Sequence, residues 1–210
     1  MHNFPLKKKD KGALEVICGP MFSGKSEELI RRLRRAKIAK QSVLTFKHRF
    51  DNRQTIEFVR SHDGNTMEAD ALDDIAQLLA LALHPMVNVV GIDEVQFFTQ
   101  DIIGIICQLI DAGKRVIAAG LDLDFRGIPF GPMPVLLAIA DSVCKLQAIC
   151  TECGNDAHFS QRLVNGNPAR YDDPIILIGA QEAYQARCRS CYIIDQTPFF
   201  HEQNKNNLQM

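Results

Sequence analysis

Residues 19–26 read GPMFSGKS, which matches the spacing G-x-x-x-x-G-K-[ST] of a phosphate-binding loop. The apolar run ALEVICG (13–19) predicts a buried strand before it, and helical spacing of apolar residues follows over 25–40. In this strand–loop–helix context, backbone N–H groups and the start of the helix bind phosphate oxygens. The Lys25 ammonium reaches the outer phosphates in such loops, and the Ser26 hydroxyl ligates Mg²⁺. We therefore expect a nucleotide's phosphates to contact Gly19, Pro20, Met21, Phe22, Ser23, Gly24, Lys25 and Ser26.

Strand and helix patterns alternate along most of the chain. Extended apolar runs predict further strands over 42–48, 87–98, 114–122 and 142–150. Helical patterns lie between them, over 73–84, 101–113 and 134–140. This alternation predicts an α/β fold of the P-loop NTPase-like kind, with a mostly parallel sheet flanked by helices.

Two adjacent carboxylates follow the third apolar run, in VVGIDEV. An acid at the end of a strand is the second half of many phosphate-loop sites, so Asp93 is expected near Mg²⁺. Glu94 would then lie beside the outer phosphate, where it could take a proton from water or from an acceptor hydroxyl. A pair of solvated acids at a strand end is the alternative interpretation.

The four cysteines of two Cys-x-x-Cys pairs, separated by residues 154–187, predict a metal site. Two such turns suit one tetrahedral Zn²⁺ held by four thiolates, a closed structural site with no open position for catalysis. Free thiols or a redox dithiol are the alternatives. The expected ligands are Cys150, Cys153, Cys188 and Cys191.

Composition limits the classes of function. The chain has 210 residues, 46% of them hydrophobic and 23% charged, as in an ordinary globular protein. A net charge of -1 gives no global attraction to nucleic acid or to an anionic membrane surface, and no apolar stretch has the length of a membrane span. Seven cysteines, an odd number, without a secretory signal favour a reducing, cytoplasmic location.

The composition of the sequence changes near Cys150, and this change predicts two domains with flanking tails. The polar, turn-rich segment beyond that residue is expected to form a small zinc-binding domain. The expected divisions are a disordered basic leader (1–12), a phosphate-loop ATP-binding α/β domain (13–149), the zinc-binding domain (150–195) and a polar tail (196–210).

Two further stretches carry candidate site residues. The segment RSHDGNTMEA (60–69) contains Asp63, and a surface turn is its simpler interpretation. The loop GLDLDFRGIPFGP (120–132) follows the fourth strand, which should end at the same edge of the sheet as the phosphate loop. Its aromatic residues could line a base pocket or pack on the core.

The motifs together resemble those of one family, the type II (cellular-type) thymidine kinases. In chain order they are GPMFSGKS, SHDGNTMEA, IDEVQFF, GLDLDFRGIPF, CTEC and IGAQEAYQARCRSCY, and the resemblance covers roughly residues 13 to 195. It implies transfer of the γ-phosphate of ATP to the 5′-hydroxyl of thymidine, giving dTMP and ADP in nucleotide salvage. Deoxyuridine is a second acceptor that the resemblance allows.

The resemblance also implies roles for individual residues. Glu94 is the expected base, and Ser26, Asp63 and Asp93 form the expected Mg²⁺ and phosphate region. The zinc-held segment 150–195 corresponds to the family's lasso, a lid over the thymine base. The family commonly forms homotetramers and is inhibited by dTTP. The expected nucleoside pocket consists of Met21, Gln96, Phe97, Leu121, Phe125, Phe130, Ser160, Leu177, Ile178 and Tyr184.

Two other functions remain open at this point. A zinc-ribbon P-loop ATPase acting on nucleic acid would use the same phosphate loop, with its base activating water. The net charge and the lack of a basic stripe on the zinc segment speak against it. A catalytically silent binding protein is the third hypothesis, and the intact set of Lys25, Ser26, Asp93 and Glu94 speaks against that one.

Overall fold

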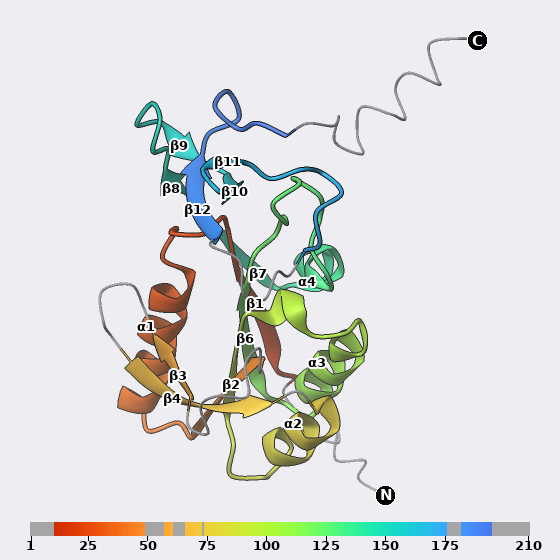
Figure 1. Ribbon diagram of the computed structural model, residues 1–210. Coiled ribbons are helices and arrows are strands. Elements are labelled where there is room, and N and C mark those ends of the chain that lie inside the picture. The colour runs from red at the N-terminus through yellow and green to blue at the C-terminus, as the bar shows by residue number, and fades with distance from the viewer. Residues whose placement is uncertain (1–10, 49–56, 61–65, 73, 176–181, 195–210) are drawn as a thin grey trace, which may run out of the picture.

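The computed structural model describes residues 11–48, 57–60, 66–72, 74–175 and 182–194 (Figure 1). Within these ranges the largest element is a sheet with the strand order β3-β4-β2-β5-β6-β1-β7. All neighbours in it pair in parallel except β3 and β4, which are antiparallel. The strands are β1 (Ala13–Cys18), β2 (Val43–His48), β3 (Glu57–Arg60), β4 (Thr66–Leu72), β5 (Val89–Asp93), β6 (Arg115–Gly120) and β7 (Ser142–Lys145).

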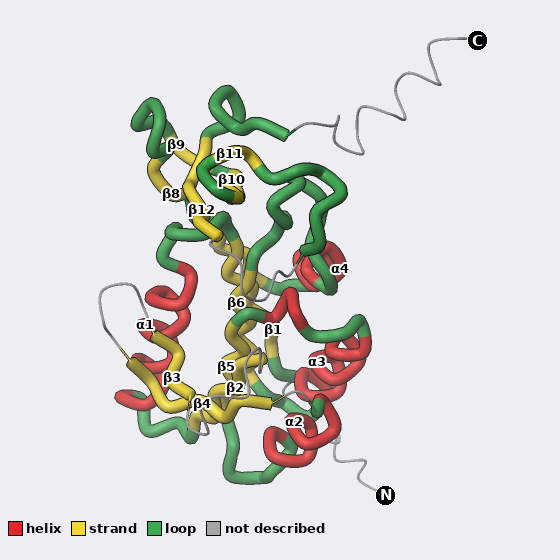
Figure 2. The backbone as a smooth tube through the Cα atoms, in the orientation of Figure 1, coloured by secondary structure: helices red, strands yellow, loops and turns green. Residues whose placement is uncertain are grey.

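Helices cover both faces of this sheet. Figure 1 shows α1 (Lys25–Ile38) alone on one face, and α2 (Ile75–Ala82) with α3 (Asp101–Asp111) on the other. A short helix, α4 (Met133–Ile139), also lies on the α3 side (Figure 2). The expected α/β fold with a mostly parallel sheet flanked by helices is therefore confirmed.

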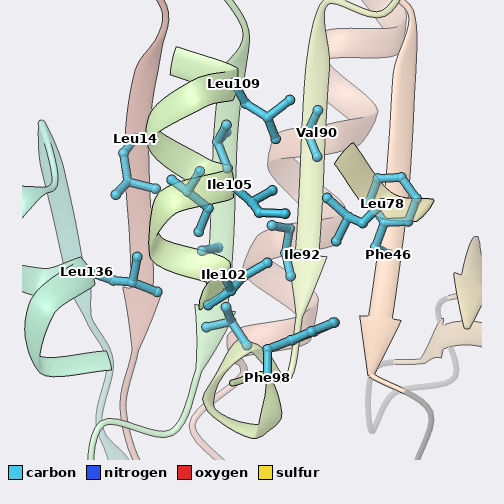
Figure 3. Close-up of a cluster of buried hydrophobic side chains, with 14 of the residues drawn as sticks. Leu14, Phe46, Leu78, Val90, Ile92, Phe98, Ile102, Ile105, Leu109 and Leu136 are labelled. Atoms are coloured by element: carbon cyan, nitrogen blue, oxygen red, sulfur yellow. The ribbon is translucent and has the colours of Figure 1, made fainter. Parts of the chain in front are cut away.

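The strands alternate their apolar side chains between two hydrophobic clusters, as their two-residue period requires. Val90 and Ile92 of β5 belong to the cluster under α2 and α3, whereas Val89 belongs to the cluster under α1. Figure 3 shows the first cluster, in which Ile102 and Ile105 of α3 lie over β5 and β6. Because both faces are covered, the central strands are buried throughout and read as continuous apolar runs.

The residues after β7 form two small sheets beyond the edge of the main sheet at which β1 ends (Figure 1). One is the antiparallel pair of β8 (Ala148–Ile149) and β9 (Asp156–Ala157). The other places β10 (Phe159–Val164) between β11 (Asn167–Pro168) and β12 (Glu182–Arg187). We keep the name lasso for residues 150–195, of which the structure describes 150–175 and 182–194.

The structure corrects two expected strands. The run 87–98 is a strand only as far as Asp93, because Glu94 has φ 53° and ψ 39° and turns the chain into a 3₁₀ turn, η1 (Val95–Phe97). Val95 and Phe98 still pack into the core, which is why the apolar pattern continues past the strand. The run 142–150 is split, because Ala148 pairs with Ala157 and packs into a separate cluster in the lasso.

The stretch 60–69, interpreted as a surface turn, includes Arg60 at the end of β3 and residues 66–69 of β4, and residues 61–65 lie outside the described ranges. Strands β3 and β4 pair at both of its ends, with Arg60 opposite Thr66, and the expected Asp63 lies outside the described residues. None of the helices in the described ranges has the length and apolar character needed to cross a membrane.

The packing of α1 on the sheet predicts a strong, position-dependent effect on stability. Leu33 of α1 is fully buried, whereas Ile38 on the same helix is 81% exposed. We expect Leu33→Ala to lower the free energy of unfolding by about 2–5 kcal/mol, because it leaves a cavity. The matched Ile38→Ala change should alter it by less than about 0.5 kcal/mol. Urea unfolding of both variants measures this, and equal losses would contradict the packing described.

Candidate active site

The phosphate loop joins β1 to α1 and depends on two glycines with left-handed φ angles, Gly19 at 144° and Gly24 at 84°. A Cβ at position 19 would lie 2.4 Å from the carbonyl oxygen of Leu146, so a side chain cannot be accommodated there. The carbonyl oxygen of Pro20 accepts hydrogen bonds from Ser23 Oγ at 2.8 Å and from Lys25 Nζ at 2.7 Å. The ammonium group of Lys25 therefore bonds to the backbone of its own loop.

A hydroxyl and a carboxylate meet behind this loop. Ser26 Oγ, in the first turn of α1, donates to Asp93 Oδ2 at 3.1 Å. Asp93 is the last residue of β5 and is almost fully buried, and burial together with the neighbouring Glu94 carboxylate raises its pKa above the ordinary value. A buried carboxylate of this kind gains stability from a cation, and hydroxyl and carboxylate oxygens are the ligands that Mg²⁺ prefers. Ser26 and Asp93 therefore fit a magnesium site.

The pKa of Lys25 depends on its burial and on the neighbouring carboxylates. Burial lowers the pKa of this lysine, and the carboxylates of Glu94, Asp93 and Asp122 oppose that shift. Asp122 follows β6 and pairs through Oδ2 with Lys145 Nζ at 2.8 Å. Its Oδ1 is buried and has no hydrogen-bond partner among the described residues. The charges of three carboxylates thus favour the protonated form of Lys25, the form that attracts phosphate oxygens.

Glu94, the second acid of the pair, follows β5 directly and has a left-handed backbone conformation. Non-glycine residues adopt this conformation at a cost of about 1–2 kcal/mol, and such strain is common at functional sites. Gln96 Nε2 donates to Glu94 Oε2 at 2.6 Å, and Gln96 Oε1 accepts from the backbone N–H of Leu121 at 3.0 Å.

Aromatic side chains lie in η1 and in the loop after β6. The rings of Phe97 and Phe130 meet edge to face, with centroids 5.3 Å apart. Phe125 is buried, and the guanidinium of Arg162 lies 4.9 Å from its ring centroid. The Tyr192 hydroxyl donates to the carbonyl oxygen of Phe125 at 2.6 Å. The loop after β6 is therefore held by residues of the lasso.

The lasso also contacts the phosphate loop directly. The backbone N–H of Met21 donates to Ser160 Oγ, on β10, at 2.9 Å. Ser160 and Arg162 are two residues apart on one strand, so both side chains point to the same face. Tyr184 on β12 lies opposite Arg162 in the antiparallel register and shares that face. This face of the lasso therefore looks toward the phosphate loop and Phe125.

The four cysteines of the two Cys-x-x-Cys turns converge at the far end of the lasso, which confirms the expected cluster. Their sulfur atoms all lie within 4.8 Å of one another, and the sulfurs of Cys153 and Cys188 are 3.5 Å apart. Metal–sulfur bonds of about 2.3 Å in a tetrahedron place sulfurs about 3.8 Å apart, so the four thiols could bind zinc. The apolar cluster there contains only alanines and cysteines, so the segment has little core of its own.

The structure thus brings together most of the residues expected from the sequence, drawn from the loop after β1, α1, β5, η1, the loop after β6, β10 and β12. Leu177 and Ile178, like Asp63, lie outside the described residues. Sequence reasoning missed Arg162 and Tyr192, which hold Phe125. An arginine in a short polar strand gives no signal that it is buried, and only the contact with a distant loop identifies it.

Comparison with known families gives one match that covers most of the chain. The family model described as thymidine kinase matches residues 12–192. The matched range contains the phosphate loop, the Asp93–Glu94 pair, the loop after β6 and all four clustered cysteines. The chain belongs to the thymidine kinase family.

Proposed function

We propose that this protein transfers the γ-phosphate of ATP to the 5′-hydroxyl of thymidine, giving dTMP and ADP, as a type II thymidine kinase. Family membership implies a kinase that acts on thymidine. The observation that carries the finer proposal is the convergence of three features at one edge of the sheet. These are the phosphate loop, the Ser26–Asp93 pair and the strained Glu94 beside an aromatic loop.

ATP would be held by the phosphate loop, residues 19–26. Lys25 has its ammonium group inside the loop and would exchange its bond to Pro20 for bonds to phosphate oxygens. Ser26 and Asp93 would hold Mg²⁺, which neutralises charge on the transferring phosphate when it is bound. Asp63 is proposed to lie near the same ions on the basis of the resemblance alone.

Glu94 is the proposed general base for the acceptor hydroxyl. It follows the proposed magnesium ligand and precedes the aromatic residues, and in this proposal it would lie between the phosphates and the nucleoside. Phosphoryl transfer needs positioning and charge stabilisation more than covalent chemistry, and a carboxylate fixed in one orientation suits that need.

Thymidine is proposed to bind between the loop after β6 and the lasso. Phe97 and Phe130 supply apolar surface, the resemblance adds the buried Phe125, and the Ser160 and Tyr184 face of β10 and β12 would cover the base. The resemblance adds Met21, Leu121, Leu177 and Ile178 to this pocket. Zinc on the four cysteines would fix the two ends of the lasso and so hold this lid in place.

The remaining proposals rest on the resemblance to type II enzymes. They are a homotetrameric assembly, inhibition by dTTP, use of deoxyuridine as a second acceptor and a cytoplasmic location. No observation among the described residues bears on them separately.

Nucleic-acid-stimulated ATP hydrolysis is the weaker alternative, because two arginines of α1 are paired with carboxylates. Arg31 and Arg32 both bond Glu28, and Arg32 and Arg115 both bond Glu15, at 2.6–2.8 Å. The 370 Å³ pocket that these arginines line also contains Arg35, and Glu15 and Glu28 offset part of its positive charge.

The direct test of the proposed function is a product assay. With ATP and Mg²⁺, the purified protein should form dTMP only when thymidine is added, and single-stranded DNA should leave the rate of ADP release unchanged. Chromatography of nucleosides and nucleotides measures both products. ADP release that DNA stimulates, without dTMP, would favour the alternative.

Replacing Glu94 tests the proposed base. Glu94→Gln keeps the shape of the side chain and removes the carboxylate, so kcat should fall by roughly 10²–10⁴-fold. The dissociation constants of ATP and thymidine, measured by calorimetry, should change little. Asp111→Asn, an exposed acid on α3, is the control and should keep the wild-type kcat. Normal turnover by Glu94→Gln would refute the assignment.

Replacing a cysteine tests the link between zinc and the lid. Cys188→Ser should release zinc, because one of four thiolates is lost, and thymidine binding should be lost with it. Binding of ATP with Mg²⁺ should persist, since the main sheet has its own core. Calorimetry with each ligand beside a zinc assay measures this, and Cys107→Ser, an exposed cysteine on α3, is the control. Unchanged zinc content and full activity in Cys188→Ser would contradict the four-thiolate site.

A further inference from the structure

We infer that Gln96 is a positioning residue for the base Glu94 and does not serve mainly to bind the nucleoside. This inference rests on the proposed function, because it takes Glu94 as the base. It differs from the role that resemblance assigns to this glutamine, which is a place in the nucleoside pocket.

The first observation is that both ends of the Gln96 amide are engaged within the protein. Its Oε1 accepts from the N–H of Leu121, and its Nε2 donates to Glu94. A backbone N–H can only donate, so it fixes the oxygen of the amide on the β6 side and the NH₂ group on the Glu94 side. The donor is therefore directed at the carboxylate by the backbone of a neighbouring strand end.

The second observation is that the surrounding backbone is shaped around this side chain. Gln96 is only 2% exposed. A Cβ on Gly120 would lie 2.5 Å from Gln96 Oε1, and a Cβ on Gly131 would lie 2.2 Å from the Gln96 carbonyl oxygen. Contacts this short do not occur, so both glycines are needed for Gln96 to lie where it does.

The third observation is the conformation of the residue that receives the bond. Glu94 is left-handed and connects directly to the 3₁₀ turn that carries Gln96. A strained residue keeps its conformation only when its surroundings determine it, and the 2.6 Å bond from Gln96 is the side-chain contact described for the Glu94 carboxylate. The bond from the Phe97 N–H to the Glu94 carbonyl oxygen, at 3.1 Å, closes the turn, and the bond from Gln96 fixes the orientation of the carboxylate.

The test separates positioning from substrate binding. Gln96→Met has nearly the same volume but cannot donate to Glu94, so kcat should fall roughly 10–10²-fold, the loss expected from a misplaced catalytic group. The dissociation constants of thymidine and of ATP should stay within about twofold of the wild-type values, because no ligand contact is removed. Gln108→Met, an exposed glutamine on α3, is the matched control and should leave all three values unchanged.

The effect of Gln96→Met on kcat is also measured in the Glu94→Gln variant, because a merely structural role would lower kcat there as well. In Glu94→Gln, the base is already absent, so adding Gln96→Met should lower kcat by no more than about twofold. If Gln96→Met fails to bind ATP, Gln96→Asn, which is too short to reach both partners, replaces it in both backgrounds.

The outcomes are distinct. A raised thymidine dissociation constant with an unchanged kcat would overturn the inference and return Gln96 to the nucleoside pocket. Equal losses of kcat in the wild-type and Glu94→Gln backgrounds would also overturn it. A wild-type protein that forms no dTMP would instead refute the proposed function.

Discussion

The parallel pairing of β1, β5 and β6 is the constraint on which the rest of the site depends. Parallel strands end at the same edge, so the chain segments that leave them must meet there. The phosphate loop follows β1, Glu94 follows β5, and Leu121 follows β6. The bond from Ser26 to Asp93 joins the segment after β1 to the end of β5, and the bond from the Leu121 N–H to Gln96 joins the segments after β6 and β5. Within the segment after β5, Gln96 also bonds Glu94. The two buried clusters hold the strands in register and thereby hold the site.

The lasso adds the side of the site that the sheet cannot supply. It contacts the sheet edge at two places, where Ser160 accepts from Met21 and where Arg162 and Tyr192 hold Phe125. One of these contacts is to the phosphate loop and the other to the proposed base pocket. The lasso therefore joins the two proposed substrate sites, and its small core of alanines and cysteines is one that a metal on the four thiols would stabilise.

Features determined by local sequence could be predicted, and features determined by contacts between distant segments could not. The spacing of Gly19, Gly24 and Lys25 predicted the phosphate loop because these residues lie in one short turn. The sulfur cluster joins distant segments, and it could be predicted because two Cys-x-x-Cys pairs together supply the four thiolates that one zinc ion takes. The turn at Glu94 was missed because Val95 and Phe98 are as buried after the strand as within it. The burial of Arg162 depends on Phe125, and the direction of the Gln96 amide depends on β6, and neither contact leaves a pattern in the sequence.

A structure with thymidine, Mg²⁺ and a non-hydrolysable ATP analogue bound together tests the central claim most directly. The account predicts a Glu94 carboxylate oxygen within about 2.6–3.2 Å of the 5′-hydroxyl of thymidine, the reach of a general base. It also predicts that this hydroxyl faces the γ-phosphate and that the Gln96 amide still bonds Glu94. Thymidine bound with its 5′-hydroxyl away from Glu94, or with Gln96 turned from the carboxylate to the base, would contradict it.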